Sequence, residues 1–516
     1  MCRRLTLVLL GLALAACRDT TSVGDRLPAG ERIVVLVPEA LRGDLDPRLN
    51  TRAWPGKIIH LIYEGATSVH NETLEPRPAL AERIDRPDPV TYDLHLRADA
   101  RFQDGAPVTA EDLRATYDSL RNPALQSPFR VQFERIKSME VRGPRDLRVV
   151  LDAPHAPFLS DLSIGVVPAA ALDADGHAIG PLWGAGPYRV LDQNGSREVV
   201  LERFDGYWAG RPRTRYLVLR TVADPNTRLL ALLGGAGDFM QNAVSPRMAD
   251  AMRGRRGLAV DTAPGVSYSY LAFNLREGPL GDVRVRQAFA HAVDRDRLIT
   301  HKFRGVARPA TGMLPVGHWA YTDDVPRYGY DPAAARALLD ASGYPDPPGD
   351  APRFTLTLKS SPDKFRRNLA TLIASDLAAV GVQVVVHSLE LGTLLADVKS
   401  GNFETYILQW GDPSEPHFYN WIFHSGRIPT PTEPNRGGNR GGYVNLRVDA
   451  LIDAGRAATN REERRGLYME LQRIVARDLP YLSLWHEDVV VVRRAGLKGY
   501  VPLPDASLFG LWRAGW

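Results

Sequence analysis

The segment from residue 354 to residue 389 constrains the fold of this chain more than any other. Its letters FTLTLKSS read as a strand, DKFRRNLATLIASDLAAVG as a helix of about sixteen residues that ends at Gly381, and VQVVVHSL as a second strand. A strand, a helix and a strand in this order form a right-handed crossover, which makes the two strands parallel. Parallel sheets are covered by helices, so the sequence predicts an α/β fold.

The length of 516 residues exceeds what one hydrophobic core usually organises, so we expect two or three folding units. A hydrophobic content of 44% with 24% charged residues is ordinary for a soluble globular protein. The formal net charge is only +4, and lysine and arginine are scattered along the chain instead of forming runs. These values argue against nucleic acid as a partner.

The N-terminal stretch MCRRLTLVLLGLALAAC differs from the rest of the chain. A basic start precedes an apolar run that ends at Ala16, and this run is too short to cross about 30 Å of hydrocarbon. The pattern predicts a secretory signal peptide over residues 1–17. Its last letters, LAAC, resemble a bacterial lipobox, in which Cys17 would carry the lipid. The alternative is a plain signal peptide with an incidental cysteine.

The lipobox interpretation places the protein in the bacterial cell envelope, lipid-anchored on the periplasmic or extracellular face of a membrane. Residues 18–30 are polar with glycine and proline, as expected of a tether. With Cys2 removed and Cys17 acylated, the mature chain has no thiol for a disulfide or a cysteine metal site. Its stability must then come from packing.

Local patterns predict further elements. Tyr92, Leu94 and Leu96 alternate as in a half-buried strand. VTAEDLRATYDSL then begins a helix at Thr109, with Asp112 placed as in a capping box, so this region reads as a compact α+β unit. The later stretches DPAAARALLDASG and VRVRQAFAHAVDRDRL read as amphipathic helices.

Known catalytic motifs are missing from the sequence. GxSxG, HExxH and GxxxxGK[ST] do not occur, and the twelve histidines show no paired spacing for a metal. We therefore predict neither an enzyme nor a metal or other cofactor. The glycines of LLGGAGDF read as a helix-ending turn. The run NRGGNRGG, residues 435–442, reads as a solvated loop, with an anion site as the alternative.

The stretch LQWGDPSEPHFYNW, residues 408–421, follows a strand candidate, FETYILQW. Its two carboxylates allow three interpretations, namely a catalytic acid pair, a structural corner or a seat for a charged ligand. Ligands of open α/β sheets bind outside the carboxyl ends of the strands. The position of Asp412 and Glu415 therefore favours a binding edge, while the corner stays open as an interpretation.

An ordered set of stretches runs along residues 31–516: LDP (45–47), IYEG (62–65), LEPRPALAERI (74–84), YDLHLRADARFQDGAPVTAEDL (92–113), GAGPYRV (184–190), GYWAGRP (206–212), FNLREGPLGDVRVRQAFAHAVDRDRL (273–298), GDPSEP (411–416) and LKGY (497–500). Together they resemble the extracellular solute-binding proteins of ABC transporters, in the family that includes the oligopeptide- and dipeptide-binding proteins. The resemblance rests on the order of the set and not on any single stretch.

This resemblance implies a two-lobed, type II periplasmic-binding-protein-like α/β fold with a hinge and an extra α+β domain inserted in lobe I. Ligand would bind between the lobes, closure would hide it from water, and delivery to the permease subunits would follow. The expected protein is a monomer that takes peptides, although other members carry sugars, metal chelates, haem or opines. A secreted hydrolase, and a sensor or chaperone of the same fold, are the alternatives. The expected domains are lobe I at 31–68, 181–270 and 486–516, the inserted domain at 69–180, and lobe II at 271–485.

In peptide-binding members an Asp shortly after a Trp pairs with the α-ammonium group of the ligand. The match here is Asp412, with Trp410 before it and Glu415-Pro416 at the family spacing. A peptide brings a cation into a closed cleft, where desolvation is costly unless an anion receives it. The resemblance therefore implies that Asp412 is the ammonium seat, that Trp410 walls the pocket, and that Glu415 and Pro416 shape the turn.

Three more residues are expected to contact the ligand, namely Phe129, Ala53 and Trp54. Phe129 stands where the family pattern has a tyrosine, so that hydroxyl is absent. Oligopeptide-binding members carry basic residues for the carboxylate end of the ligand at the positions of Val398 and Ile407. The far end of the pocket is therefore expected to differ from theirs.

Overall fold

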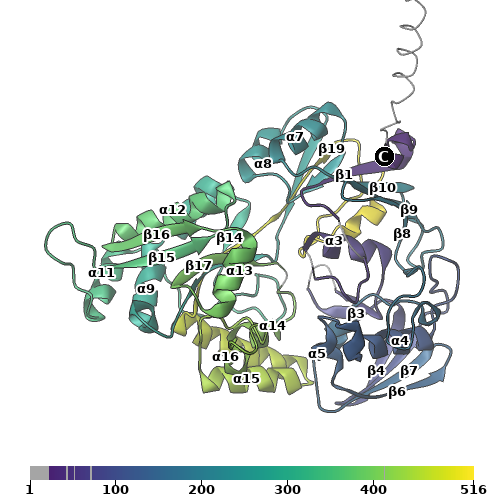
Figure 1. Ribbon diagram of the computed structural model, residues 1–516, viewed down its shortest axis with the longest axis horizontal. Coiled ribbons are helices and arrows are strands. Elements are labelled where there is room, and N and C mark those ends of the chain that lie inside the picture. Colours follow the sequence, from purple (N-terminus) through teal and green to yellow (C-terminus); the bar gives the residue numbers. More distant parts are fainter. Residues whose placement is uncertain (1–21, 42–44, 52, 70–72, 412) are drawn as a thin grey trace, which may run out of the picture.

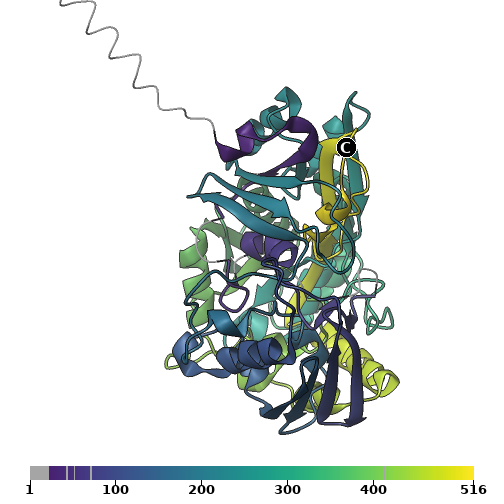
Figure 2. The same ribbon diagram turned by 90° about the vertical axis from the view of Figure 1, so that its right-hand side faces the viewer.

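The computed structural model describes residues 22–41, 45–51, 53–69, 73–411 and 413–516. In this part of the chain the strands form three larger sheets and one two-stranded sheet. Figure 1 shows two bodies side by side, one built on a six-stranded sheet and the other on a seven-stranded sheet. The four-stranded sheet lies below the seven-stranded one, as the side view also shows (Figure 2).

The seven-stranded sheet has a mixed topology. Its strand β1 (Arg32–Val37) is parallel to both of its neighbours, and the remaining pairs of strands are antiparallel. The side chains of β1 alternate between two hydrophobic cores, because successive residues of a strand point to opposite faces. Ile33 and Val35 face the core that includes the helix 53–62, whereas Val34 and Leu36 face the core that includes the helix 225–234. In spatial order its strands are β12 (Leu258–Ala263), β19 (Val489–Arg494), β11 (Phe239–Gln241), β1 (Arg32–Val37), β10 (Tyr216–Thr221), β9 (Glu198–Arg203) and β8 (Tyr188–Asn194).

The six-stranded sheet contains the predicted crossover. Its strands, in spatial order, are β14 (Ala307–Pro309), β18 (Tyr481–Glu487), β13 (Tyr268–Phe273), β17 (Thr405–Trp410), β15 (Phe354–Ser360) and β16 (Val382–Ser388). β15 and β16 are parallel, and the helix α12 (Lys364–Ala378) connects them, which confirms the prediction. The side chain of Asp363 caps α12 by accepting a hydrogen bond from the backbone N–H of Arg366.

The four-stranded sheet is antiparallel, in the order β4 (Ala81–Asp88), β5 (Thr91–Leu96), β7 (Asp146–Leu151) and β6 (Ile136–Gly143). Tyr92, Leu94 and Leu96 of β5 are buried, as their alternation predicted. The helix α4 (Ala110–Arg121) begins with the predicted capping box between Thr109 and Asp112. The strands β2 (Thr67–Val69) and β3 (Pro76–Pro78) form a small antiparallel sheet and precede β4 in the chain.

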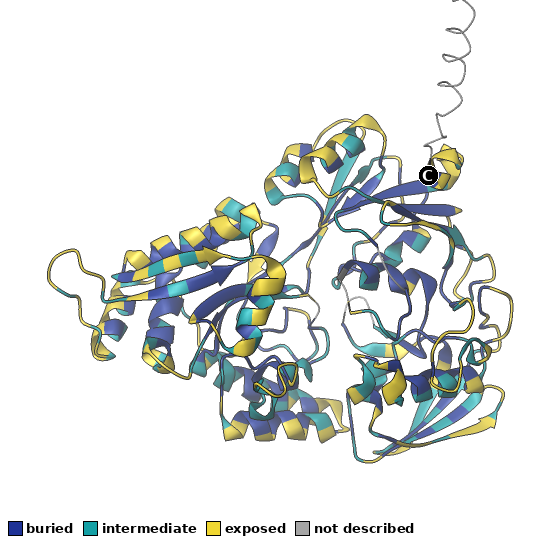
Figure 3. Cartoon of the chain, in the orientation of Figure 1, coloured by how far each residue is buried: buried dark blue, intermediate teal, exposed yellow. Residues whose placement is uncertain are grey.

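The other helices pack on the sheets or on one another, with their outer faces exposed and their inner faces buried (Figure 3). Their bounds are α2 (Val23–Arg26), α3 (Ala53–Ile62), α5 (Arg130–Phe133), α6 (Phe158–Asp161), α7 (Pro225–Gly234), α8 (Pro246–Met252), α9 (Val283–Ala292), α10 (Arg295–Leu298), α11 (Pro332–Ala341), α13 (Leu391–Ser400), α14 (Phe418–Phe423), α15 (Leu446–Ala457) and α16 (Arg461–Asp478). Short 3-10 turns and one π-helical segment complete the described elements: η1 (Ala29–Glu31), η2 (Pro123–Leu125), η3 (Ala169–Ala171), η4 (Pro279–Gly281), η5 (Ile299–Phe303), η6 (Ser425–Arg427) and η7 (Phe509–Arg513). Within the described ranges, no helix has the length and apolar character needed to cross a membrane.

The chain passes between the seven-stranded and six-stranded sheets at two neighbouring places, between β12 and β13 and between β18 and β19. These crossings contact each other closely, since a Cβ atom at Gly265 would lie 2.2 Å from the carbonyl oxygen of Glu487. The expected domain boundaries at residues 270 and 485 fall inside β13 and β18. We propose to move both boundaries to the crossings, because each strand pairs only within the six-stranded sheet among the described residues.

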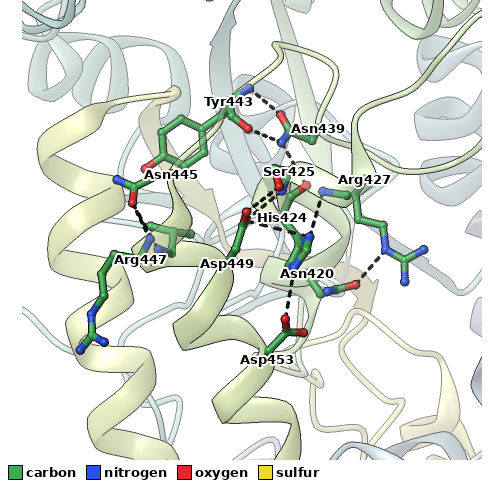
Figure 4. A network of polar contacts seen from close by, with 12 residues as sticks. Asn420, His424, Ser425, Arg427, Asn439, Tyr443, Asn445, Arg447, Asp449 and Asp453 are labelled. Carbon is green, nitrogen blue, oxygen red and sulfur yellow. Dashed lines mark hydrogen bonds and ion pairs between the residues drawn. The ribbon is translucent and has the colours of Figure 1, made fainter.

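The glycine-rich run 435–442 differs from its prediction as a solvated loop. Its second half is buried, with Asn439 2% and Arg440 8% exposed. The Asn439 side chain donates to the carbonyl oxygen of Tyr443 at 2.8 Å and accepts from the Tyr443 N–H at 2.9 Å (Figure 4). A Cβ atom at Gly441 would lie 2.3 Å from the carbonyl oxygen of Phe273. The prediction was wrong because these glycines allow close backbone packing against the end of β13.

Candidate ligand cavity between the lobes

A cavity of about 300 Å³ lies where the two bodies face each other. Residues 60–69 and 74–77, the segment 160–163 after the four-stranded sheet, and residues 503–509 near the C-terminus line one side. Ser414 and Glu415, in the turn after β17, line it from the other body. A second cavity of about 300 Å³ shares His60 and the 160–163 segment with the first, so the two form neighbouring chambers.

The segment that carries Asp161 is held by the core of the four-stranded sheet. Phe158, at the start of α6, is fully buried and packs edge-on against Tyr92 of β5, with the ring centroids 5.0 Å apart. A Cβ atom at Gly65 would lie 2.5 Å from the carbonyl carbon of Ser163, so glycine permits the chain after α3 to lie against this segment. These contacts fix where Asp161 enters the cavity.

Asp161 faces the cavity with a side chain that is 16% exposed. Its Oδ2 lies 3.2 Å from Nε2 of His155. Burial raises the pKa of the Asp161 carboxyl, the hydrogen bond to His155 lowers it, and repulsion from Glu415 raises it further. The carboxylate form of Asp161 is therefore poorly compensated by the protein.

Glu64 is a second buried carboxyl in the lining, 8% exposed. Nε1 of Trp208 donates to its Oε2 at 2.6 Å, and the Tyr207 hydroxyl donates to its Oε1 at 3.4 Å. Burial raises the pKa of Glu64 to about 7, although these hydrogen bonds and the charges of Arg97 and Arg77 act to lower it. Its hydrogen-bond partners are neutral, so the charge of Glu64 is solvated without being cancelled.

Asp505 and His60 lie at the side of the cavity formed by α3 and the C-terminal segment. Oδ1 of Asp505 accepts a hydrogen bond from the backbone N–H of Ser507 at 2.8 Å. Burial raises the pKa of Asp505, whereas that backbone hydrogen bond and the charges of His60 and Lys57 lower it. Lys57 therefore brings a positive charge near Asp505, although no ion pair between the two side chains forms in the described part of the chain.

Glu415 connects the two bodies. One carboxylate oxygen pairs with the guanidinium of Arg464 from α16 and accepts from the backbone N–H of His417 at 3.0 Å. The other accepts from the Ser160 hydroxyl, across the cavity, at 3.1 Å. The expectation that Glu415 shapes the turn is therefore only part of its role, since its side chain also bridges the bodies and lines the cavity.

The balance of charge around the cavity is negative. Its lining carries four carboxyl groups and the guanidinium of Arg77, besides the imidazole of His60. In the described part of the chain, Glu415 pairs with Arg464, whereas no lysine or arginine forms an ion pair with the other three carboxyls. Such an arrangement can receive a cation, because an opposite charge offsets the desolvation of buried carboxylates. The described residues contain no cluster of side chains that could hold a metal ion.

The sequence-predicted site residues fall in different places. Asp412 and Cys17 lie outside the described residues, and of Ala53 only the backbone, at the start of α3, is described. Phe129 lines the second chamber. Trp54, 9% exposed, packs in the core under the seven-stranded sheet and lies outside the lining of both chambers.

Trp410 ends β17 inside an aromatic group of the six-stranded sheet. Its ring stacks on Tyr270 at 6.0 Å and meets Phe418 edge-on at 5.3 Å, and the Arg440 guanidinium lies 5.3 Å from its centroid. Trp410 is also outside the lining of both chambers, so its contact with ligand stays a prediction. Val398 and Ile407 are buried core residues, which explains why neither position offers a charge to a ligand.

Sequence reasoning missed Glu64, Asp161, Asp505 and Arg77. Only Glu64 had a visible signal, because it stands in the IYEG stretch, where an acid among apolar residues needs a reason for its burial. Asp161 and Asp505 come from segments far from Glu64 in the chain, and the proximity of all four side chains depends on the folded arrangement.

Comparisons with known proteins agree with this architecture. The family model described as bacterial extracellular solute-binding proteins, family 5, matches residues 75–429. The dipeptide-binding protein of Escherichia coli is 28% identical over 96% of both chains. The glutathione-binding protein GsiB of Pectobacterium atrosepticum is 30% identical over 81% of both chains.

Solved structures share the fold. NikZ from Campylobacter jejuni, in complex with Ni(L-His), superposes with a TM-score of 0.82 at 24% identity and covers 95% of this chain and 100% of its own. DppA from Helicobacter pylori, in complex with the peptide STSA, has a TM-score of 0.78 at 23% identity, over 94% and 98% of the two chains. The chain thus has the two-lobed, type II periplasmic-binding-protein fold, and it belongs to the bacterial extracellular solute-binding proteins of family 5.

Proposed function

We propose that this protein is the solute-binding component of an ABC importer and that it captures a peptide or a peptide-like solute between its lobes. The observation that carries the proposal is the negatively charged cavity, which segments of both lobes line. An ammonium group on the ligand would offset the desolvation of its carboxylates. The curated relatives, named for binding dipeptides and glutathione, support peptide chemistry.

The two ends of a peptide require opposite charges from the protein. We keep Asp412 as the seat of the α-ammonium group, as the family resemblance implies. At about 4 Å and an effective dielectric constant near 20, such a pair contributes on the order of 4 kcal/mol before desolvation. Arg77 is the one guanidinium among the described lining residues, so we assign the carboxylate end of the ligand to it.

Isothermal titration calorimetry of the soluble form with a panel of di- to pentapeptides tests the proposal. We expect binding with a negative heat-capacity change, because closure buries apolar surface. Arg77→Gln is expected to weaken peptides with a free carboxylate about tenfold and amidated peptides much less. Asp412→Asn should weaken peptides with a free amino terminus more than acetylated ones. Failure of every peptide to bind would contradict peptide capture.

We also propose that the protein releases its ligand unchanged to the permease, that it acts as a monomer, and that the lipid on Cys17 holds it at the membrane. The alternative of a secreted hydrolase needs Glu415 as a catalytic acid or base. Its carboxylate oxygens are already engaged by Arg464, Ser160 and His417, which argues against that role. Mass spectrometry should recover the peptide intact after long incubation.

Cys17→Ser should release the protein from membranes, and a variant that stays attached would exclude the lipid anchor.

A further inference from the structure

Two carboxylates from different lobes face the same cavity. Asp161 enters it from α6, beside the four-stranded sheet, and Glu415 enters it from the turn after β17. The residue next to Asp161 in the chain touches Glu415 directly, since the Ser160 hydroxyl donates to Oε2 of Glu415 at 3.1 Å. Closing the lobes therefore brings the two carboxylates into the same small volume.

The protein compensates these two carboxylates unequally. Glu415 has the guanidinium of Arg464, whose side chain is 10% exposed and also donates to the carbonyl oxygen of Gly455 at 2.9 Å. Asp161 has the His155 ring at 3.2 Å and, in the described part of the chain, no ion pair with lysine or arginine. Repulsion between the like charges therefore opposes closure mainly at Asp161.

The rest of the lining adds to the need for positive charge. Glu64 and Asp505 also face the cavity, and Arg77 is the described guanidinium there. Neither carboxylate forms an ion pair with lysine or arginine in the described part of the chain, and one α-ammonium group, assigned above to Asp412, does not change that. A second positive charge on the ligand would lie in this part of the cavity, where low solvent exposure strengthens its attraction to a carboxylate.

We propose that Asp161 selects ligands that carry a basic side chain, lysine or arginine, and that this cation between Asp161 and Glu415 favours closure of the lobes. The inference rests on the proposed function and adds the class of peptide. A neutral side chain in the same place leaves the two carboxylates facing each other as the lobes close. Asp161 is therefore a specificity-determining residue, and the protein prefers cationic peptides.

Four tripeptides test this assignment by calorimetry. They carry lysine or its uncharged analogue norleucine in the middle, each with a free or an acetylated amino terminus. The wild-type protein is expected to bind the lysine peptides at least about tenfold more tightly than the norleucine peptides. Asp161→Asn should reduce that preference to less than about threefold, with little change for norleucine peptides. Asp161→Glu, which keeps the charge, should retain the preference.

Glu82→Gln is the matched control, because it removes a carboxylate from the exposed face of β4, away from the cavity. It should keep the wild-type preference. An equal loss for all four peptides in Asp161→Asn would give Asp161 a structural role and overturn the inference. So would a preference that is unchanged in Asp161→Asn, or one that follows acetylation instead of lysine. Tight wild-type binding without any lysine preference would overturn the inference alone, whereas binding of none of the peptides would overturn the proposed function as well.

Discussion

Single carboxyl groups decide the chemistry of the interlobe cavity. Glu64, Asp161 and Asp505 are desolvated by the fold, and their pKa values are raised in consequence. Apolar side chains at these positions would avoid the desolvation free energy of the carboxyl groups. A ligand that brings positive charge into the cavity would explain why carboxyl groups stand there instead.

Glu64→Gln should change how stability depends on pH. The pKa of Glu64 is about 7 in the folded protein and near 4.5 in the unfolded chain, so the unfolded state loses its proton first. Between these values rising pH destabilises the wild-type fold, by on the order of 1 to 3 kcal/mol once Glu64 is fully ionised. We expect the variant to melt close to the wild type at pH 5 and several degrees above it at pH 8.

Scanning calorimetry of the ligand-free proteins across pH 5 to 8 measures this difference. The neighbouring titrations of His60 and Asp505 occur in both proteins and largely cancel in the comparison. Glu82→Gln, on the exposed surface, should show no pH-dependent difference from the wild type. A constant offset between Glu64→Gln and the wild type at every pH would show that the charge of Glu64 is not the destabilising group.

Residue roles were the hardest feature to predict from the sequence. The family spacing pointed to Asp412 and assigned Glu415 to the turn, yet Glu415 bridges two lobes through Ser160 and Arg464. No local pattern could indicate this, because Ser160 and Glu415 are 255 residues apart. Asp161 was overlooked for the same reason, because the other carboxyl groups of the cavity come from distant segments.

Elements were predicted well wherever local chemistry specifies them. The β15–α12–β16 unit follows from apolar periodicity, and α4 follows from the Thr109–Asp112 capping box. The segment VRVRQAFAHAVDRDRL forms α9 only to Ala292, because the backbone leaves helical geometry at Val293 and Asp294 caps a new turn. The 435–442 run was mispredicted because its glycines serve contacts with distant backbone.

The contact of α6 with the turn after β17 acts as a closure contact at the scale of elements. Two further contacts link the same two lobes. The backbone N–H of Ala156 donates to the carbonyl oxygen of Arg456 at 2.7 Å, and Arg461 forms an ion pair with Glu75 at 2.6 Å. Ser160→Ala removes one hydrogen bond that spans the lobes. A net contribution of about 1 kcal/mol predicts dissociation of ligand about five times faster.

Stopped-flow tryptophan fluorescence with a peptide identified by calorimetry measures this rate. Ser138→Ala, which removes an exposed hydroxyl from β6, is the control and should leave the rate unchanged. Equal dissociation rates for the wild type and Ser160→Ala would mean that this contact does not hold the closed form.

At the scale of the whole molecule, two lobes joined by two adjacent crossings face each other across a charged cavity. We expect the hinge at the crossings between β12 and β13 and between β18 and β19, because motion there leaves both sheets intact. The two-lobed class could be predicted from the ordered motifs. The shape and charge of the cavity could not, since they arise only when lobes I and II meet.

A crystal structure of the protein with a lysine-containing tripeptide would show whether Asp161 receives the cation of the ligand side chain. We expect peptide density between the lobes, with the lysine ammonium within hydrogen-bond distance of Asp161 and the C-terminal carboxylate beside Arg77. Density in that cavity with the lysine directed to solvent would contradict the selective role of Asp161. Peptide bound outside the interlobe cavity would contradict both ligand capture between the lobes and the role of Asp161.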